Sequence, residues 1–584
     1  MSQKTLKKLR RLENVSSTPG MVSEPVKGIW QIIKENWKFL LILCVGIVVL
    51  YFNGMHGDFV SDDYASIPDN AGIMSFSNQT KGLIGGLINW SMAVLFGIKN
   101  PIPYHIFSLV LYLLVCIFAF IFLYIVFDKK TAILSTILFA VLPIHVETVS
   151  WISGKPYLLT SITILPEMIL FVLYLKTGIK KYLWWFLALL PITFLAEKVR
   201  SISLLLLVPL FILTFGNNFK KKIPWGKIFL FSSLVIVVLA IFLWPSVNAR
   251  INDVNSGYNG YGGNFYDPFF QYPTSIAKYL QLALVPTDLT LYHTMYVLPT
   301  WLNWLIMLTY LGAVGYFFFK DKKIFFALAF IFLATAPSMA PVKVSWLVAE
   351  RYLFLGSLGF CAFLVLFFQR FEKKWKIPLL IIFCLMVGLY SVRTFLRNDD
   401  WQTNHKLWVR TCQVSPNSHN AWNNIGDDYD KLAQLETTDE GKLKQYLNAV
   451  KGFTESVTVK QNYADAYHNR ANIFYKIGRY DLARDSYETA LSYGPNLYQS
   501  YYSLLQIDLT EKNFTSALNH LNKLNTIKPN DPQVYYAASV VYANMGRTDQ
   551  AISILEQLVK TYPTWTQASS LLTQLNSSNV GKTN

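Results

Sequence analysis

Charged residues are scarce in this chain. They make up only 15% of its 584 residues, against roughly 25% in an ordinary soluble domain. The shortage is uneven, because long apolar runs fill residues 37–397, whereas residues 1–35 and 398–584 read as polar or ordinary soluble sequence. This distribution excludes a soluble multidomain enzyme, and it also excludes disorder as the main state of the chain.

Cysteine is scarce as well. The chain has five cysteines, none in a CxxC spacing, and all but the last lie within apolar segments: Cys44, Cys116, Cys361, Cys384 and Cys412. A disulfide framework or a zinc site is therefore not expected.

The chain has an excess of positive charge, with a formal net charge of +17. Many of the Lys and Arg residues sit in short clusters between apolar runs, which is typical of membrane topology rather than of nucleic-acid binding. We therefore expect a membrane lipid environment and no nucleic-acid partner.

The apolar runs predict membrane spans, since a helix crosses a bilayer with about 20 apolar residues. Eleven runs meet or approach that length: 36–53, 102–127, 131–149, 157–176, 182–196, 201–216, 226–245, 299–319, 324–341, 351–369 and 377–396. The stretch Tyr272–Pro286 is amphipathic and contains Lys278, so we expect it to lie along, or dip into, one membrane surface.

The basic clusters test this count. With a cytoplasmic N-terminus, every second loop should be rich in Lys or Arg, and five such loops agree: Lys129–Lys130, Lys176 with Lys180–Lys181, Lys220–Lys222, Lys320 with Lys322–Lys323, and Arg370 with Lys373, Lys374 and Lys376. An odd number of spans places the C-terminal domain on the extracytoplasmic side.

A fixed period follows the apolar region. Prolines recur every 34 residues, at Pro495, Pro529 and Pro563. Alanines recur at the same spacing, at Ala483, Ala517 and Ala551, and Gly478, Asn513 and Gly546 are assigned to one turn position. A 34-residue helix–turn–helix with small residues where helices touch is the tetratricopeptide repeat signature.

An earlier copy begins near Asn420, where Trp422, Ile425, Gly426 and Tyr429 match the opening of the repeat. It holds about 11 extra residues, which we assign to 436–446. The expected fold is all-α: a polytopic helical membrane domain followed by an α-solenoid of about four repeats, whose concave face binds peptide or protein. The expected divisions are 1–35, cytoplasmic segment; 36–397, membrane domain; 398–419, linker; 420–575, repeats; and 576–584, tail.

Ionisable residues gather at the outer ends of the spans. They are Asp58, Asp62, Asp63, Asp69, His145, Glu147, Lys155, Glu197, Lys198, Arg200, Lys343, Glu350 and Arg351. The basic members oppose the positive-inside bias, and ionisable groups near membrane depth tend to be functional. Cations beside carboxylates at one membrane face fit an anionic lipid head group held next to a catalytic acid or base.

Each of these groups also has a structural interpretation. Asp62 or Ser61 can cap a helix over residues 64–67, and Glu350 and Arg351 can form a pair that joins two spans. His145 and Glu147 are two residues apart with no HExxH motif, so a zinc hydrolase is not favoured.

These residues lie in a recognisable series of motifs. The series consists of Phe59-Val-Ser-Asp62-Asp63-Tyr-Ala-Ser-Ile67 with Asn70, Pro103-Tyr104-His105, the block 138–155 with Pro143-Ile-His145-Val-Glu147, Ala349-Glu350-Arg351-Tyr352 continuing to Phe360, Arg397-Asn398 with Trp401, Leu407-Trp408 and Pro416-Asn417. In this order the motifs resemble the transmembrane and tetratricopeptide repeat-containing protein O-mannosyltransferases, which have a C-type glycosyltransferase (GT-C) fold. The resemblance covers the chain from about residue 50 onward.

The resemblance implies transfer of a sugar, with inversion, from a polyprenyl-phosphate carrier to a Ser/Thr hydroxyl of an extracytoplasmic protein. It implies that a loop carboxylate, Asp62 or Asp63, is the general base, which fits the need of an attacking hydroxyl to lose its proton. The leaving phosphate needs cations. Arg351 is the first choice, and the further candidates are Lys155, Lys198, Arg200 and Lys343. The residues expected to organise the cleft are His105, His145, Glu147, Glu197 and Glu350.

The sequence departs from the family pattern at several positions. Lys155 stands where the family has arginine, Tyr157 where it has glutamate and Leu142 where it has histidine, and Glu197-Lys198 reverses the order of its charged pair. These changes affect the expected sugar and its contacts more than the expected reaction class. Mannose is the sugar that we expect first.

Two other functions remain as alternatives: the same fold acting on a glycolipid or cell-wall glycan, and a non-catalytic membrane scaffold with a docking domain. No cofactor is firmly predicted. Adjacent aspartates can hold a divalent ion, but no other ligands are spaced to complete the site. A divalent cation at Asp62 and Asp63 is kept as the alternative to no metal.

Overall fold

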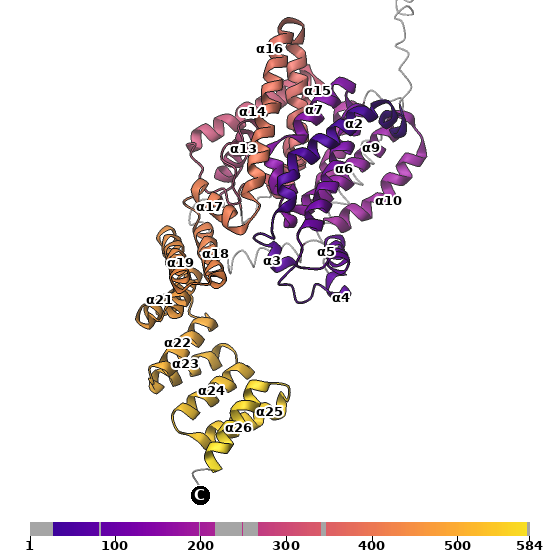
Figure 1. The fold of residues 1–584 in the computed structure, drawn as a ribbon. Coiled ribbons are helices and arrows are strands. Elements are labelled where there is room, and N and C mark those ends of the chain that lie inside the picture. Colours follow the sequence, from indigo (N-terminus) through magenta and orange to yellow (C-terminus); the bar gives the residue numbers. More distant parts are fainter. Residues whose placement is uncertain are drawn as a thin grey trace, which may run out of the picture.

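The computed structural model describes residues 27–80, 83–197, 199–216, 267–339 and 346–580, together with the single residues Trp244 and Asn248. Helices are the only regular elements in these parts of the chain. They form a helical bundle followed by a row of paired helices that leads away from one end of it (Figure 1). The predicted all-α fold is confirmed for the described residues.

The bundle is built from long apolar helices, which pack because each buries a wide hydrophobic face. They are α2 (Ile29–Tyr51), α6 (Ile102–Val126), α7 (Lys129–Ala140), α9 (Lys155–Thr177), α10 (Lys180–Ala196), α11 (Ile202–Phe215), α13 (Pro268–Leu284), α14 (Thr300–Lys320), α15 (Lys322–Thr335) and α16 (Ser357–Asp400). Helix α6 is central and packs against α2, α7 and α9.

Among the described residues, five helices are long and apolar enough to cross a membrane, and the bent pair α7 and 143–149 makes up to six. Shorter apolar helices, α11 among them, accompany these. The chain is thus a multi-pass membrane protein. The count of eleven stays a prediction, and the expected span 226–245 lies outside the described residues, apart from Trp244.

The two predicted spans 351–369 and 377–396 are joined in the structure. Helix α16 (Ser357–Asp400) consists of two helical segments that meet at a kink at Trp375, where the backbone angles are non-helical. The kink falls in the basic cluster that was predicted to be a loop. The predicted start at Arg351 is wrong, because residues 350–353 form a separate 3₁₀ turn.

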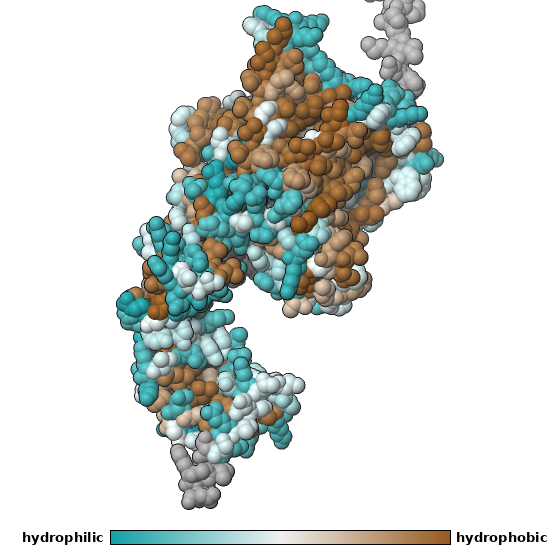
Figure 2. Space-filling view, in the orientation of Figure 1, coloured by the Kyte–Doolittle hydropathy of each residue, from teal (hydrophilic) through white to brown (hydrophobic). Residues whose placement is uncertain are grey.

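The flank of the bundle is apolar. Large hydrophobic side chains are exposed there, including Trp184, Trp185, Leu380, Leu385 and Leu389, and Figure 2 shows a brown hydrophobic band with hydrophilic residues above and below it. An apolar surface of this extent belongs against lipid.

Short helices occupy the end of the bundle nearest the repeats. They are η1 (Phe52–His56), α3 (Asp63–Ser66), α4 (Phe76–Thr80), α5 (Leu83–Phe96), η2 (Pro143–His145), α8 (Val146–Val149), η3 (Ile152–Gly154), η5 (Ala336–Ser338) and η6 (Glu350–Leu353). Contacts join α3 to η3, and η2 and α8 to η6. Segments far apart in sequence therefore meet in one layer. The amphipathic stretch predicted at 272–286 is helix α13.

The repeats follow as antiparallel helix pairs. The four pairs are α18 (His419–Leu435) with α19 (Asp439–Val459), α20 (Ala464–Lys476) with α21 (Tyr480–Tyr493), α22 (Tyr498–Thr510) with α23 (Phe514–Ile527), and α24 (Pro532–Asn544) with α25 (Thr548–Thr561). Helix α17 (Asn404–Val414) lies in the predicted linker before them, and α26 (Thr566–Val580) follows them. The periodic alanines Ala483, Ala517 and Ala551 are fully buried, as expected where helices touch.

One predicted turn position is shifted. The residue with a left-handed backbone is Lys512 (φ 59°), in register with Gly478 and Gly546 (φ 78° and 75°). Asn513, the predicted occupant, is instead the N-cap of α23, and its side chain accepts a hydrogen bond from the Ser516 N–H.

The extra residues of the first repeat lengthen its helices. Helices α18 and α19 have 17 and 21 residues, whereas α20 and α21 have 13 and 14. Gly426 lies at the crossing of α18 and α19, where a Cβ atom would stand 2.7 Å from the ring of Phe453. Only glycine allows this approach without displacement of the ring.

Candidate functional site

Asp63 is the first residue of α3, and the fold encloses it. Its side chain is fully buried and accepts hydrogen bonds from Val60 N–H (3.1 Å), Ser153 N–H (2.7 Å) and Ser153 Oγ (2.5 Å). Burial raises the pKa of Asp63 to about 6, although these hydrogen bonds and the charge of Lys155 act in the opposite direction. Asp63 thus ties the first loop to the turn before α9.

Asp62, its neighbour, is exposed. It occupies the N-cap position of α3, but its side chain makes no capping hydrogen bond, so the cap interpretation is wrong for this residue. The preceding Ser61 has a positive φ of 53°, and its N–H donates to Asn404 Oδ1 at 2.8 Å. The contact with Asn404 of α17 holds Ser61 in this left-handed conformation. The turn at Ser61 directs Asp62 to the surface and Asp63 into the interior.

Asp62 lines a cavity of about 290 Å³ between the first loop and the first repeat, a volume at the lower end of the usual range for ligand sites. The lining is mostly polar and comes from the first loop, α17, α18 and neighbouring segments. It includes Asp62, Asn404, Asn420, Asn424, Asp427, Asp428 and Lys431. An exposed carboxylate beside such a cavity can accept a proton from a hydroxyl bound there.

Lys155 provides a cation near Asp63. Its Nζ donates to Asn89 Oδ1 at 2.9 Å and lies 5.6 Å from the centre of the Tyr104 ring. No ion pair joins Lys155 to a carboxylate in the described part of the chain. His105 lies close by, with its Nε2 3.1 Å from the Gly57 carbonyl oxygen.

Arg351 is held by Glu147. The guanidinium pairs with one carboxylate oxygen, and the Arg351 N–H donates to the other at 2.8 Å. The guanidinium also lies 5.3 Å and 5.1 Å from the ring centres of Trp151 and Tyr352. Both partners are buried, so this ion pair fastens η6 to α8.

Glu350 has different partners. It accepts hydrogen bonds from Thr290 N–H (2.6 Å) and from Arg397 Nη2 (3.1 Å), and Arg397 also pairs with Asp400 at 3.0 Å. The suggested pair between Glu350 and Arg351 is therefore wrong. The two residues anchor one turn to two separate parts of the bundle.

His145 is part of the buried framework. Its Nδ1 is 2.9 Å from Tyr112 Oη and its Nε2 is 2.8 Å from Ser357 Oγ, and Phe139 and Phe354 pack against its ring. The structure thus separates His145 from the Asp62 cavity and uses it to join α6, η2 and α16.

Arg200 is paired with Glu197. The ion pair is 2.6 Å long, Arg200 Nη2 donates to Tyr157 Oη at 2.9 Å, and the guanidinium lies 4.0 Å from the centre of that ring. The adjoining cavity measures only about 20 Å³, which suffices for a water molecule but not for a sugar. The other two predicted cations, Lys198 and Lys343, lie outside the described residues.

The described residues contain no cluster of metal-binding side chains. No group of three or more His, Cys, Asp or Glu residues lies close enough to hold a metal within the described ranges. Asp62 and Asp63 lie in different environments, one exposed and the other enclosed.

Sequence reasoning assigned no role to several residues that build the site. Ser153, Asn89 and Asn404 position the acidic loop and Lys155, and Asp427 lines the cavity from α18. The acidic residues around Asp427 are visible in the sequence, but the predicted binding face of the repeats did not single out any of them.

The fold and site define a class: a multi-pass membrane domain whose first loop, with Asp62 and Asp63, meets a tetratricopeptide repeat array. Two profiles described as tetratricopeptide repeat match the chain, over residues 464–497 and 508–575.

Comparison with characterised proteins identifies the particular relatives. The chain is 24% identical to human Protein O-mannosyl-transferase TMTC3 over 593 residues, covering 90% of this chain and 61% of that protein. It is 24% identical to Protein O-mannosyl-transferase F38B6.6 of Caenorhabditis elegans, over 75% of this chain and 65% of that protein. The chain is homologous to the TMTC protein O-mannosyl-transferases and spans less than two thirds of the length of these relatives.

Solved structures match at low similarity. YrrB, a TPR protein with an unusual peptide-binding site, is 16% identical, with a TM-score of 0.25 over 35% of this chain and 96% of that one. A thermophilic TPR protein of Thermus thermophilus is 15% identical, with a TM-score of 0.18 over 37% of this chain and 89% of that one.

Proposed function

We propose that this protein transfers a sugar, with mannose the first expectation, from a polyprenyl-phosphate carrier to a Ser or Thr hydroxyl of an extracytoplasmic polypeptide, with inversion. The homology to O-mannosyl-transferases over most of the chain supports the reaction class. One observation carries the proposal for the site: Asp62 is exposed on a cavity shared by the membrane domain and the first repeat.

In this proposal Asp62 is the general base. The hydroxyl of an acceptor bound in the cavity loses its proton to the Asp62 carboxylate as its oxygen attacks the anomeric carbon. Asp63 is a positioning residue, because all of its hydrogen bonds hold the loop and its carboxylate is buried. The strained Ser61 backbone supports this division, because it fixes the direction of Asp62.

The departing polyprenyl phosphate requires a cation near the base. Lys155 is the best supported candidate, because its ammonium has no carboxylate partner among the described residues and its charge acts on Asp63. Arg351 and Arg200 already neutralise Glu147 and Glu197, so we assign these two arginines to holding the helices around them in place. Lys198 and Lys343 remain candidates from the sequence.

Incubation of purified full-length protein with a panel of polyprenyl-phosphate sugars and Ser/Thr peptides tests the function. Mass spectrometry should detect a peptide that has gained one hexose, and mannose is the expected sugar. Transfer to a glycolipid or glycan acceptor with none to any peptide would contradict the acceptor assignment. No transfer from any donor would contradict the enzymatic function.

We further propose that the catalytic loop and the repeats lie on the extracytoplasmic side. The alternation of basic loops supports this orientation, and contacts such as Ser61 to Asn404 require both parts to share one side. Single cysteines introduced at Asp69 and Asp549, in a background without accessible native cysteines, should react with a membrane-impermeant maleimide in intact cells. Labelling only after permeabilisation would reverse the orientation.

A further inference from the structure

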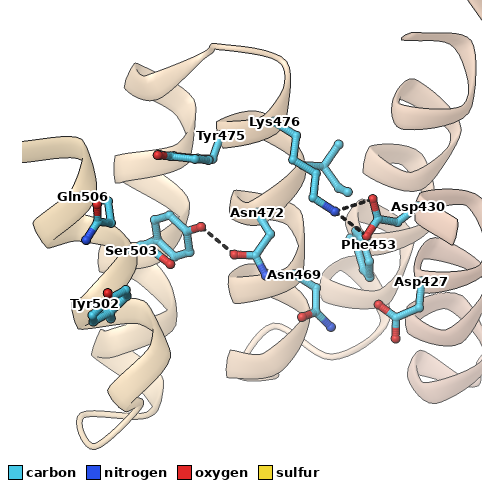
Figure 3. Close-up of a pocket in the computed structure, with 12 residues that line it drawn as sticks. Asp427, Asp430, Phe453, Asn469, Asn472, Tyr475, Lys476, Tyr502, Ser503 and Gln506 are labelled. Atoms are coloured by element: carbon cyan, nitrogen blue, oxygen red, sulfur yellow. Dashed lines mark hydrogen bonds and ion pairs between the residues drawn. The ribbon is translucent and has the colours of Figure 1, made fainter. Parts of the chain in front are cut away.

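Two cavities meet at Asp427. The cavity that contains Asp62 continues to Asp427 on α18. A second cavity, of about 350 Å³, begins at Asp427 and runs between the repeat helices past Asn469 and Asn472 to Gln506 (Figure 3). Because both cavities have Asp427 in their lining, we refer to them together as the groove, which extends from Asp62 to the repeat helices.

Within the described ranges, Asp427 is the one acidic residue of α18 in this groove that has no ion pair. Asp428 pairs with His405 at 2.8 Å and Asp430 pairs with Lys476 at 2.7 Å. The Asp427 side chain has only a 3.5 Å hydrogen bond from Asn423 Nδ2 in the described part of the chain. Burial raises its pKa to about 7, although the charges of Lys431 and Lys476 act in the opposite direction, because a partly buried carboxylate without a direct ion pair is costly to ionise.

The nearest cations are engaged elsewhere. Lys476 Nζ donates to both oxygens of Asp430, as Figure 3 shows. Lys431 Nζ lies 4.8 Å from the centre of the Tyr64 ring. Asp427, which lines both cavities, therefore presents a partly desolvated carboxyl group to which a cation can bind.

A second unsatisfied group lines the same groove. Asn420 Nδ2 is buried without a hydrogen-bond partner among the described residues, although its Oδ1 accepts from Tyr463 Oη at 3.4 Å. A buried amide donor is normally paired, and a peptide carbonyl is a suitable partner for it. Among the described residues, the groove thus contains an amide donor, Asn420 Nδ2, without an acceptor and a carboxylate, Asp427, without an ion-pair partner.

A polypeptide supplies both of the missing partners. Its backbone carbonyls can accept from Asn420, and a Lys or Arg side chain can pair with Asp427, whereas a neutral glycan has no cation. Two aromatic residues of the Asp62 cavity are engaged with other rings: Tyr292 is stacked on Trp346 with ring centres 4.0 Å apart, and its ring centre lies 5.6 Å from that of Trp408. A polypeptide therefore fits the groove better than a neutral glycan does.

We infer that the groove binds the acceptor as an extended polypeptide segment, and that Asp427 selects a Lys or Arg side chain at a fixed distance from the modified hydroxyl. Asn420 holds a backbone carbonyl of that segment, and the hydroxyl residue reaches Asp62. This inference rests on the proposed function for the identity of the acceptor.

Peptide binding to the purified full-length protein tests the inference without a sugar donor. Fluorescent peptides with one central Thr and a single Lys, moved one position at a time, are compared with matched peptides that contain Glu. Fluorescence anisotropy should show one favoured Lys position that binds about tenfold tighter than its Glu counterpart, the effect expected for one partly buried ion pair.

Variants identify the residue responsible. Asp427→Asn should abolish the preference for Lys over Glu, and Asp427→Lys should reverse it in favour of Glu. Asp481→Asn is the matched control, because Asp481 is an exposed repeat carboxylate paired with Arg479, outside both cavities. It should change nothing.

Equal binding of all peptides, or a Lys preference that survives Asp427→Asn, would overturn the inference. Transfer to peptides without any basic preference would overturn it and leave the proposed function intact. A Lys preference that depends on Asp427, in a protein that transfers no sugar, would support the groove and contradict the proposed function.

Discussion

Replacement of Asp63 by Asn should remove a pH dependence from the stability of the protein. The pKa of this carboxyl rises from an ordinary 3.8 to about 6 in the fold because the group is buried. Since one pKa unit corresponds to about 1.4 kcal/mol, the shift of about two units makes the ionised form cost roughly 3 kcal/mol of folding free energy.

The sign follows from linkage. The folded pKa lies above the unfolded one, so the folded state binds the proton more tightly. Below about pH 4 both states are protonated and the penalty is absent. It grows as the pH rises from about 4 to about 6 and is complete above that range. Because asparagine cannot ionise, the Asp63→Asn variant does not lose this folding free energy as the pH rises.

The assay is thermal unfolding of the detergent-solubilised protein, followed by tryptophan fluorescence from pH 4 to pH 8. The stability difference between wild type and Asp63→Asn should shift by roughly 3 kcal/mol across this range, in favour of the variant at the higher pH. Asp69→Asn, an exposed acid of the same loop, is the control and should track wild type. Parallel curves for wild type and Asp63→Asn would refute the reasoning.

Three further substitutions test the packing. Glu147→Ala should destabilise the protein by about 3–5 kcal/mol, because it leaves Arg351 buried and unpaired. In thermal unfolding, the double variant Glu147→Leu with Arg351→Met should recover most of the lost stability. Equal losses of stability in the single and the double variant would contradict the role of the ion pair. Gly426→Ala should lower the stability of the repeats by about 1–3 kcal/mol, because the new Cβ would stand 2.7 Å from the ring of Phe453. Adding Phe453→Leu should relieve this clash, and protease resistance of the repeats measures both effects. Lys512→Gly should stabilise the repeats by about 1 kcal/mol, because Lys512 has a φ of 59°; a lowered melting midpoint would show that its side chain has an unrecognised role.

Periodic and compositional features of the fold were accessible from the sequence. The 34-residue period predicted the repeats, because each helix pair needs small residues at the same crossing, and the buried alanines confirm it. The apolar runs predicted a multi-pass membrane domain because each spanning helix must pair its own backbone groups and present apolar side chains along its length. Local requirements of this kind leave a local pattern.

The partners within the site were not accessible. The pairs Arg351 with Glu147 and Arg397 with Glu350 join segments distant in sequence, and no local pattern records which opposite charge a buried group will meet. The different environments of Asp62 and Asp63 also depend on distant contacts, from Asn404 to the loop and from Ser153 to Asp63. Adjacent identical residues look equivalent until the fold surrounds one of them.

Sugar transfer by the Asp62→Asn variant tests the role of this carboxylate. Asp62 is exposed and makes no capping hydrogen bond, so the substitution should leave the melting midpoint unchanged. If Asp62 takes the proton of the acceptor hydroxyl, the transfer rate to peptide should fall by about 10²–10⁴-fold, whereas Asp69→Asn should retain the wild-type rate. Full activity of Asp62→Asn in the purified system would contradict the mechanism.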